Sequence, residues 1–161
     1  MRTILAFLFV TIFAVAAAAQ PEAPKKGPAP KNREEFMQKV LQLALDNIGN
    51  ARCGPERCAP ATDAEKKNPP LTLSETSQIV GRGIFSGGAS YCGMDWEKRN
   101  YQPMMAYWRD EKKKNERQLA LIAMIHGMMF EQFLADFAAK GKCPDEIKKD
   151  LEKRLDFKPQ S

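Results

Sequence analysis

Residues 118–137 read QLALIAMIHGMMFEQFLADF, and this stretch decides the fold class of the chain. No Asp, Glu, Lys or Arg occurs from residue 118 to residue 130. The apolar residues fall on two neighbouring helical rows, Leu119-Ile122-Ile125-Met129 and Leu121-Met124-Met128. A helix that is apolar around most of its circumference is typical of the buried centre of a helical protein. We therefore predict a core helix over residues 119–137, ending at Gly141, whose uncharged part is too short to span a bilayer.

Two amphipathic helices are predicted, one before and one after this core helix. The first begins at Asn32, a good N-cap with Glu35 completing a capping box, and stops at Gly49. Its apolar stripe recurs every four residues, at Phe36, Val40, Ala44 and Ile48. The last helix begins near Pro144 or Asp145 and carries a thin stripe of Ile147, Leu151 and Leu155. We expect both helices to pack on the same core.

The middle of the chain is rich in glycine. Thr72 or Ser74 can cap a helix that runs to about Cys92, and this helix holds four glycines, at positions 81, 83, 87 and 88. Each glycine costs about 1 kcal/mol relative to alanine in a helix. Close packing of a neighbouring helix against these small residues would offset the cost. The alternative is a loop over residues 81–88.

The remaining segments complete an all-α prediction. A further helix is expected from Met104 to about Lys114, because Pro103 suits a first helical turn. Residues 51–71 hold two cysteines and four prolines and are expected to form an irregular loop. No segment alternates as a β-strand does. The fold class is therefore all-α: a single helical domain over residues 32–158, a small bundle of four to five helices braced by two disulfides.

The N-terminus has the pattern of a cleavable secretory signal. Arg2 precedes an apolar run over residues 5–16, and alanines at positions 17–19 form a small-residue cleavage site. Residues 1–19 are therefore predicted to be a signal peptide, and the proline-rich residues 20–31 a disordered tether. The mature protein is then periplasmic or secreted. If the signal were retained, it would anchor the domain to a membrane.

Four cysteines in an exported protein predict two disulfides. We favour Cys53–Cys58, which closes a small loop, with Cys92–Cys143, which closes a loop of roughly 50 residues worth about 4 kcal/mol in the chain-entropy model. Cys53–Cys92 with Cys58–Cys143 stays as the alternative, since spacing alone does not distinguish them. A redox-active thiol pair is disfavoured because four residues, rather than two, separate Cys53 from Cys58. A zinc site is disfavoured by the oxidising compartment.

His126 is the only histidine, and it lies among methionines. Imidazole with thioether ligands suits copper, so a ligand- or copper-binding module on the Met-rich helix 119–137 is the alternative function. Met124 and Met128, however, fall on a different helical face from His126, and methionines on a buried helix commonly fill gaps in the core. One histidine on an apolar helix also gives little support to a Ser-His-Asp arrangement. We predict no enzyme, no cofactor and no metal site.

Aromatic residues gather between the glycine-rich helix and the core helix. All tyrosines and tryptophans of the chain are found here: Tyr91, Trp96, Tyr101, Tyr107 and Trp108, beside Arg109. Tyr, Trp and Arg carry much of the binding energy at protein interfaces, and aromatic rings also fill the space between helices. These six residues are the predicted partner-binding surface, with packing between helices as the alternative.

The chain is mildly basic and its charges are mixed in sign, with 25 Lys+Arg against 20 Asp+Glu. A nucleic-acid-binding domain would more often concentrate basic residues and aromatics on one face, so no nucleic acid is expected as a partner. Weak association with an anionic membrane surface or a cell wall is compatible with this charge. The predicted function is contact with an unidentified envelope protein, as an adaptor, a complex subunit or a small chaperone.

Overall fold

The computed structural model describes residues 31–159. The predicted signal peptide (1–19) lies outside the described residues, as does the predicted tether (20–31) except for Lys31. The described residues contain six α-helices, more than the four to five predicted: α1 (Arg33–Asn47), α2 (Asp63–Lys67), α3 (Leu73–Tyr91), α4 (Gln102–Ala106), α5 (Glu116–Ala138) and α6 (Asp145–Arg154). The additional helix is α2, which starts at a capping box of Thr62 and Glu65 inside the segment predicted to be a loop.

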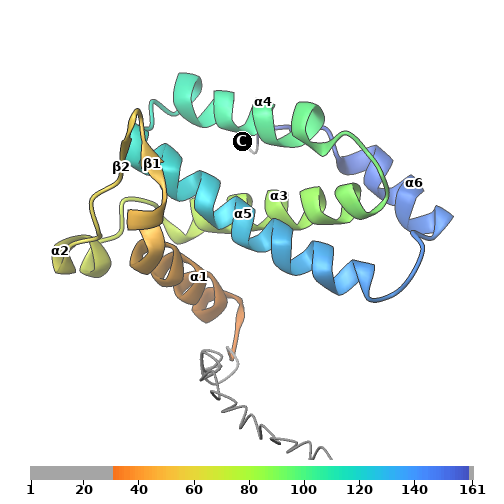
Figure 1. The fold of residues 1–161 in the computed structure, drawn as a ribbon, viewed down its shortest axis with the longest axis horizontal. Helices are drawn as coiled ribbons and strands as arrows, with labels where there is room; N and C mark the ends of the chain where they lie inside the picture. Colours follow the sequence, from red (N-terminus) through yellow and green to blue (C-terminus); the bar gives the residue numbers. More distant parts are fainter. Residues whose placement is uncertain (1–30, 160–161) are drawn as a thin grey trace, which may run out of the picture.

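Helices α3 and α5 form the centre of the fold. They lie side by side and run in the same direction (Figure 1). A Cβ atom built on Gly83 would lie 2.7 Å from the carbonyl oxygen of His126, and one on Gly87 would lie 2.8 Å from that of Phe130. Glycine at these positions therefore lets the two helix backbones approach closely. The close-packing hypothesis is confirmed, and the alternative loop over residues 81–88 is wrong.

The hydrophobic core lies between this helix pair and α1. The buried stripe of α1 consists of Met37, Val40, Leu41, Ala44 and Leu45. Leu121, Ile122 and Ile125 of α5 are 0 % exposed. Among the described helices, α5 alone has the length and hydropathy of a membrane span, and here it is the core helix that the sequence predicts.

A helical stretch over residues 96–111 returns the chain from α3 to the start of α5 (Figure 1). It consists of α4 flanked by two π-helical segments, η2 (Glu97–Tyr101) and η3 (Tyr107–Glu111). The predicted start at Pro103 is wrong, because the helix begins well before this proline. Pro103 has no N–H for the carbonyl of Arg99, four residues earlier, and that oxygen accepts the N–H of Phe157 at 2.8 Å. The proline thus frees the acceptor that docks the C-terminal segment.

A two-stranded antiparallel hairpin occupies part of the segment predicted to be an irregular loop, and the expectation that the chain has no strand is therefore wrong. Its strands are β1 (Arg52–Cys53) and β2 (Glu56–Arg57). Two residues are too few for an alternating pattern to be seen in the sequence. Gly54 has a left-handed backbone at the turn, with φ of 69°, and the Cys53–Cys58 disulfide closes the hairpin.

Both disulfides have the pairing favoured from the sequence, Cys53–Cys58 and Cys92–Cys143. The second bond joins the end of α3 to the start of α6, across a sequence separation of 51. Leu151 of α6 and the adjoining Leu155 are buried against the domain. The chain is thus mostly helical with two disulfides, which is consistent with an oxidising environment outside the cytoplasm.

Candidate functional site

The structure divides the predicted partner-binding cluster into Tyr91, the contacting rings Trp96 and Tyr101, and the contacting rings Tyr107 and Trp108. Rings outside the cluster are also contacted: Tyr91–Phe137, Trp96–Phe130, Tyr101–His126 and Tyr107–Phe157, with ring centroids 4.5 to 5.6 Å apart. Trp108 is only 2 % exposed, so its assignment to a surface is wrong: it belongs to the core. Arg109 is exposed and pairs with Asp110. These contacts agree with the alternative interpretation, in which the aromatic rings pack between helices. Partner binding by the remaining residues of the cluster stays a prediction.

A polar network that the sequence analysis did not identify is buried beside the glycine contact. Ser86 Oγ lies 2.9 Å from His126 Nε2, and the Asn100 amide donates to Ser86 Oγ at 2.7 Å. The same amide nitrogen donates to the carbonyl of Arg82, whose Nε–H donates back to Asn100 Oδ1. One signal was present in the sequence, because Arg82 and Ser86 lie four residues apart beside Gly83 and Gly87.

The chemistry of this network is limited by burial. The buried position of His126, and secondarily the positive charge of Arg82, lower the pKa of the imidazole to about 4, which keeps the ring neutral at pH 7. A hydroxyl bonded to a neutral imidazole has the contact of an activated nucleophile. Ser86 and His126 are nevertheless 0 % and 2 % exposed, so a substrate has no open path to the hydroxyl. The network therefore stabilises the packing of α3, α5 and η2.

A groove between α1, α2 and the start of α3 is a candidate binding site. It encloses about 340 Å³, within the size range of pockets that hold small ligands. Its lining combines apolar side chains with amides and lysines: Gln38, Leu41, Gln42, Lys66, Lys67, Pro69, Leu71, Thr72 and Leu73. Leu41 and Leu71 are 2 % and 3 % exposed and form the floor. The sequence analysis predicted a loop here and no groove.

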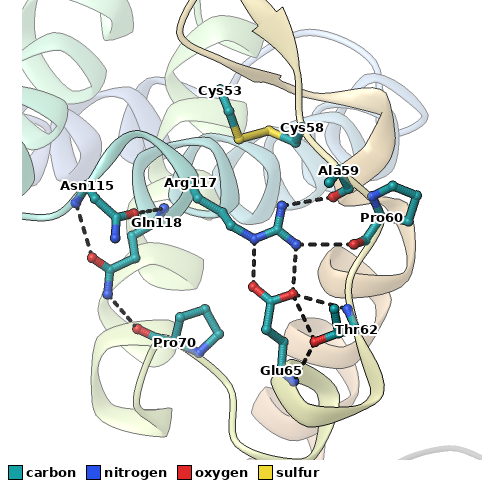
Figure 2. Close-up of polar contacts among 10 residues, drawn as sticks. All are labelled: Cys53, Cys58, Ala59, Pro60, Thr62, Glu65, Pro70, Asn115, Arg117 and Gln118. Atoms are coloured by element: carbon teal, nitrogen blue, oxygen red, sulfur yellow. Dashed lines mark hydrogen bonds and ion pairs between the residues drawn. A yellow bond between two sulfur atoms is a disulfide. The ribbon is translucent and has the colours of Figure 1, made fainter.

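Arg117 of α5 binds Glu65 of α2, the short helix that forms one side of the groove (Figure 2). Its guanidinium forms a bidentate ion pair with Glu65, with N–O distances of 2.6 and 2.8 Å. The same guanidinium donates to the carbonyls of Ala59 and Pro60. The bond to Arg117, together with the backbone N–H of Thr62, lowers the pKa of the Glu65 carboxyl to about 2. A paired, charge-assisted contact of this kind fixes the position of a short helix that buries none of its own residues.

Two further contacts fix the other walls. Gln118 Nε2 donates to the carbonyl of Pro70 at 3.0 Å, which ties the segment before α3 to the N-terminus of α5 (Figure 2). Gln42 of α1 donates to the carbonyl of Lys66 at 2.9 Å. Because α1 and α5 belong to the core, the groove is held in one shape before any ligand binds. The capping pattern from Thr62 to Glu65 was the signal in the sequence that could have located α2.

Charge is distributed unevenly around the groove. Lys66 Nζ lies 2.6 Å from Asp46 Oδ1, and this bond raises the pKa of the lysine. Lys67 is exposed and forms no ion pair within residues 31–159. Among the described residues, the groove therefore has an apolar floor and, at its edge, the positive charge of Lys67 without an ion pair.

His, Cys, Asp and Glu side chains do not gather in the described part of the chain. Residues 31–159 contain no group of three or more of them placed to hold a metal ion. His126 Nε2, one of the two imidazole nitrogens that can bind copper, is bonded to Ser86. Copper binding at that nitrogen would have to break a buried hydrogen bond, which is a cost against the alternative function on helix 119–137.

The fold and the groove define a mostly helical, disulfide-braced domain. Comparison of the chain with protein-family models, curated proteins and solved structures finds no match.

Proposed function

We propose that this small helical bundle is an exported, non-enzymatic binding domain, which holds an extended segment of an envelope protein in the groove between α1, α2 and α3. The observation that carries the proposal is the way the groove is held. Arg117 and Gln118 on the core helix α5 fix the α2 wall and the segment before α3 through five hydrogen bonds, to Glu65, Ala59, Pro60 and Pro70. A preformed groove loses little freedom when a ligand binds, and this favours binding as its role.

The chemistry of the groove indicates the kind of segment. Leu41 and Leu71 form a floor that accepts one apolar side chain, and Leu73 extends it at the start of α3. Lys67 at the edge favours an acidic residue next to that side chain, since opposite charges across an interface add specificity. The preferred partner is therefore an extended segment with an apolar residue flanked by Asp or Glu.

Burial of the Ser86–His126 pair supports the non-enzymatic part of the proposal. These two side chains form the nucleophile-like contact found above, and neither faces a cavity described here. A domain that acts by contact needs a stable surface rather than a reactive group. The two disulfides provide that stability outside the cell.

Selection from a random peptide library on the mature protein tests the proposal. The groove variant is Leu73→Glu, which places a negative charge against the expected acidic residue. The matched control is Leu43→Glu on α1, because Leu43 is 54 % exposed and does not line the groove. Circular dichroism first establishes that both variants keep the helical content of the wild type.

The expected result is enrichment of peptides that carry an apolar residue beside Asp or Glu. Their affinity should fall by about tenfold or more in Leu73→Glu, a loss of about 1.4 kcal/mol or more, and stay unchanged in Leu43→Glu. Peptides that bind both variants equally well would show that the groove is not the binding site. A library that yields no enriched sequence would contradict the proposed function.

A further inference from the structure

A second cavity lies on the opposite side of α3 from the core and has a different character. It encloses about 170 Å³ between α1, α3 and the C-terminal segment. We call it the Arg82 cavity and define it by the lining residues that matter here, Arg33, Ser77, Arg82, Phe85, Phe157 and Lys158. None of these residues lines the groove of the proposed function.

Three positive side chains line this cavity, and within residues 31–159 none of them forms an ion pair: Arg33, Arg82 and Lys158. Arg33 donates to the Ser77 hydroxyl, at 2.6 Å. Asp156, which lines the adjoining cavity, binds Arg99 directly and interacts with Arg82 and Lys158 at longer range. The cations therefore outnumber the carboxylate that they share, and an anion would reduce this excess of positive charge.

Arg82 shows this imbalance most clearly, because it is partly buried and bonded only to neutral groups. It donates to the carbonyls of Arg154 and Leu155 and to the side-chain oxygen of Asn100. Burial lowers the pKa of the guanidinium to about 10, so the group stays charged at pH 7. A guanidinium that is held in place by carbonyls keeps its full charge for a ligand.

Aromatic rings form the other wall of the cavity. The Arg82 guanidinium lies 5.4 Å from the Phe85 ring centroid and 5.6 Å from that of Phe157. Phe157 is fixed there by the hydrogen bond from its N–H to the carbonyl of Arg99. An adjoining cavity of about 340 Å³ shares Arg82, Phe85 and Lys158, and its lining adds Lys153, Asp156 and Arg154, which pairs with Asp150. Lys153 forms no ion pair within residues 31–159 and extends the positive surface beyond the first cavity.

We propose that the Arg82 cavity binds the phosphate group of an organic phosphate, with the apolar part of the ligand against Phe85 and Phe157. Three cations match the charge of a phosphate monoester, which is about −2 at neutral pH. The small volume admits a single group and excludes a folded or extended chain segment. The phosphate can belong to a soluble organophosphate or to a phospholipid headgroup. Both are recognised through anionic phosphate oxygens, although a phosphodiester headgroup carries one negative charge and a monoester about two.

Calorimetric titration of the mature protein with phenyl phosphate, and separately with inorganic phosphate, tests the site. The test variant is Arg33→Gln with Lys158→Gln, both exposed, so that the partly buried Arg82 is left in place. The matched control is Arg57→Gln with Lys142→Gln, which removes the same two charges at exposed positions far from the cavity lining. A third variant, Phe85→Leu, reduces the aromatic wall and keeps every charge.

The site predicts that phenyl phosphate binds the wild type and the control equally and binds the test variant about tenfold more weakly. Phe85→Leu should weaken phenyl phosphate and leave inorganic phosphate unchanged. The proposal is overturned if the wild type does not bind phenyl phosphate, or if both double variants weaken it to the same extent. It is also overturned if phenyl phosphate binds no more tightly than inorganic phosphate.

Sedimentation with phosphatidylglycerol vesicles distinguishes the two sources of the phosphate. Vesicle binding that phenyl phosphate displaces, and that the test variant loses, assigns the site to a lipid headgroup. Phenyl phosphate binding without vesicle binding assigns it to a soluble organophosphate. The groove variant Leu73→Glu should bind phenyl phosphate normally, so failure of the proposed function and failure of this site are separable.

Discussion

Replacing Gly83 by alanine tests the close contact between α3 and α5, on which the fold is built. The added methyl group would lie 2.7 Å from both the carbonyl oxygen of His126 and Met129 Cβ, and neither atom belongs to the flexible end of a side chain. Gly81 lies two residues earlier on the same helix and has no other atom within 4 Å of the added Cβ. Gly81→Ala is therefore a matched control in the same helix.

The magnitude follows from two opposing effects. Alanine is favoured over glycine in a helix by about 1 kcal/mol, and both variants gain this. Gly83→Ala also overpacks the interface, at a cost of about 1–3 kcal/mol, and we expect the upper end because backbone must move. The two variants should therefore differ in unfolding free energy by about 3 kcal/mol, or roughly 10 °C in Tm, with Gly81→Ala the more stable.

Urea and thermal unfolding of both variants, followed by far-UV circular dichroism, gives this difference directly. Gly81→Ala should be more stable than the wild type and Gly83→Ala less stable. Equal stability of the two variants would refute the reasoning, because it would mean that α3 and α5 are not in backbone contact at Gly83.

Three further predictions concern pH, the groove wall and the long disulfide. His126 has a pKa of about 4 in the folded protein, against 6.5 in the unfolded chain. As the pH drops from 6.5 to 4, the imidazole therefore takes up a proton in the unfolded chain but not in the fold, and the free energy of unfolding falls by up to about 3 kcal/mol. Urea unfolding at several pH values should show this slope in the wild type and a flatter one in His126→Gln; equal slopes contradict it. Glu65→Gln should cost about 1–2 kcal/mol locally, seen as faster hydrogen exchange in α2 with α5 unchanged, whereas uniform exchange would place the effect elsewhere. Cys92→Ser with Cys143→Ser should lower the unfolding free energy by about 4 kcal/mol, about 2 kcal/mol more than loss of the short hairpin disulfide, and the reverse order would contradict the loop-length argument.

The sequence predicted those parts of the fold that depend on regular spacing. Asn32 begins α1 as expected, with its side chain accepting the N–H of Glu35, although Glu35 itself accepts from Lys31 and leaves the capping box open. The uncharged run over residues 118–130 provides the buried residues of α5, because a helix that is apolar on most sides is stable only when it is surrounded by other elements. The export pattern predicted two disulfides, and the short separation of Cys53 and Cys58 favoured the pairing found without excluding the alternative.

The candidate sites could not be predicted in the same way, because they arise from contacts between distant segments. Arg117 reaches Glu65 across 52 residues, and Arg82 reaches Leu155 across 73. No periodic pattern in the local sequence indicates such pairs. Trp108 illustrates the opposite error: a residue type common at interfaces is here a core residue, and only the packing of η3 decides between the two.

The Cys92–Cys143 bond also determines how the molecule would respond to a pull on its two ends. The disulfide joins two residues that are 51 apart in the sequence. While it is intact, a force on the chain ends passes through the disulfide and not through the residues between the two cysteines. About 50 residues at roughly 3.5 Å each, or about 170 Å of extended chain, therefore cannot contribute to the length of the stretched molecule. All of α5 lies inside this closed loop, whereas α1, α2, α3 and α6 lie outside it. A force applied to the two chain ends would therefore act on these four helices, and the part of the chain that forms α5 would not carry it.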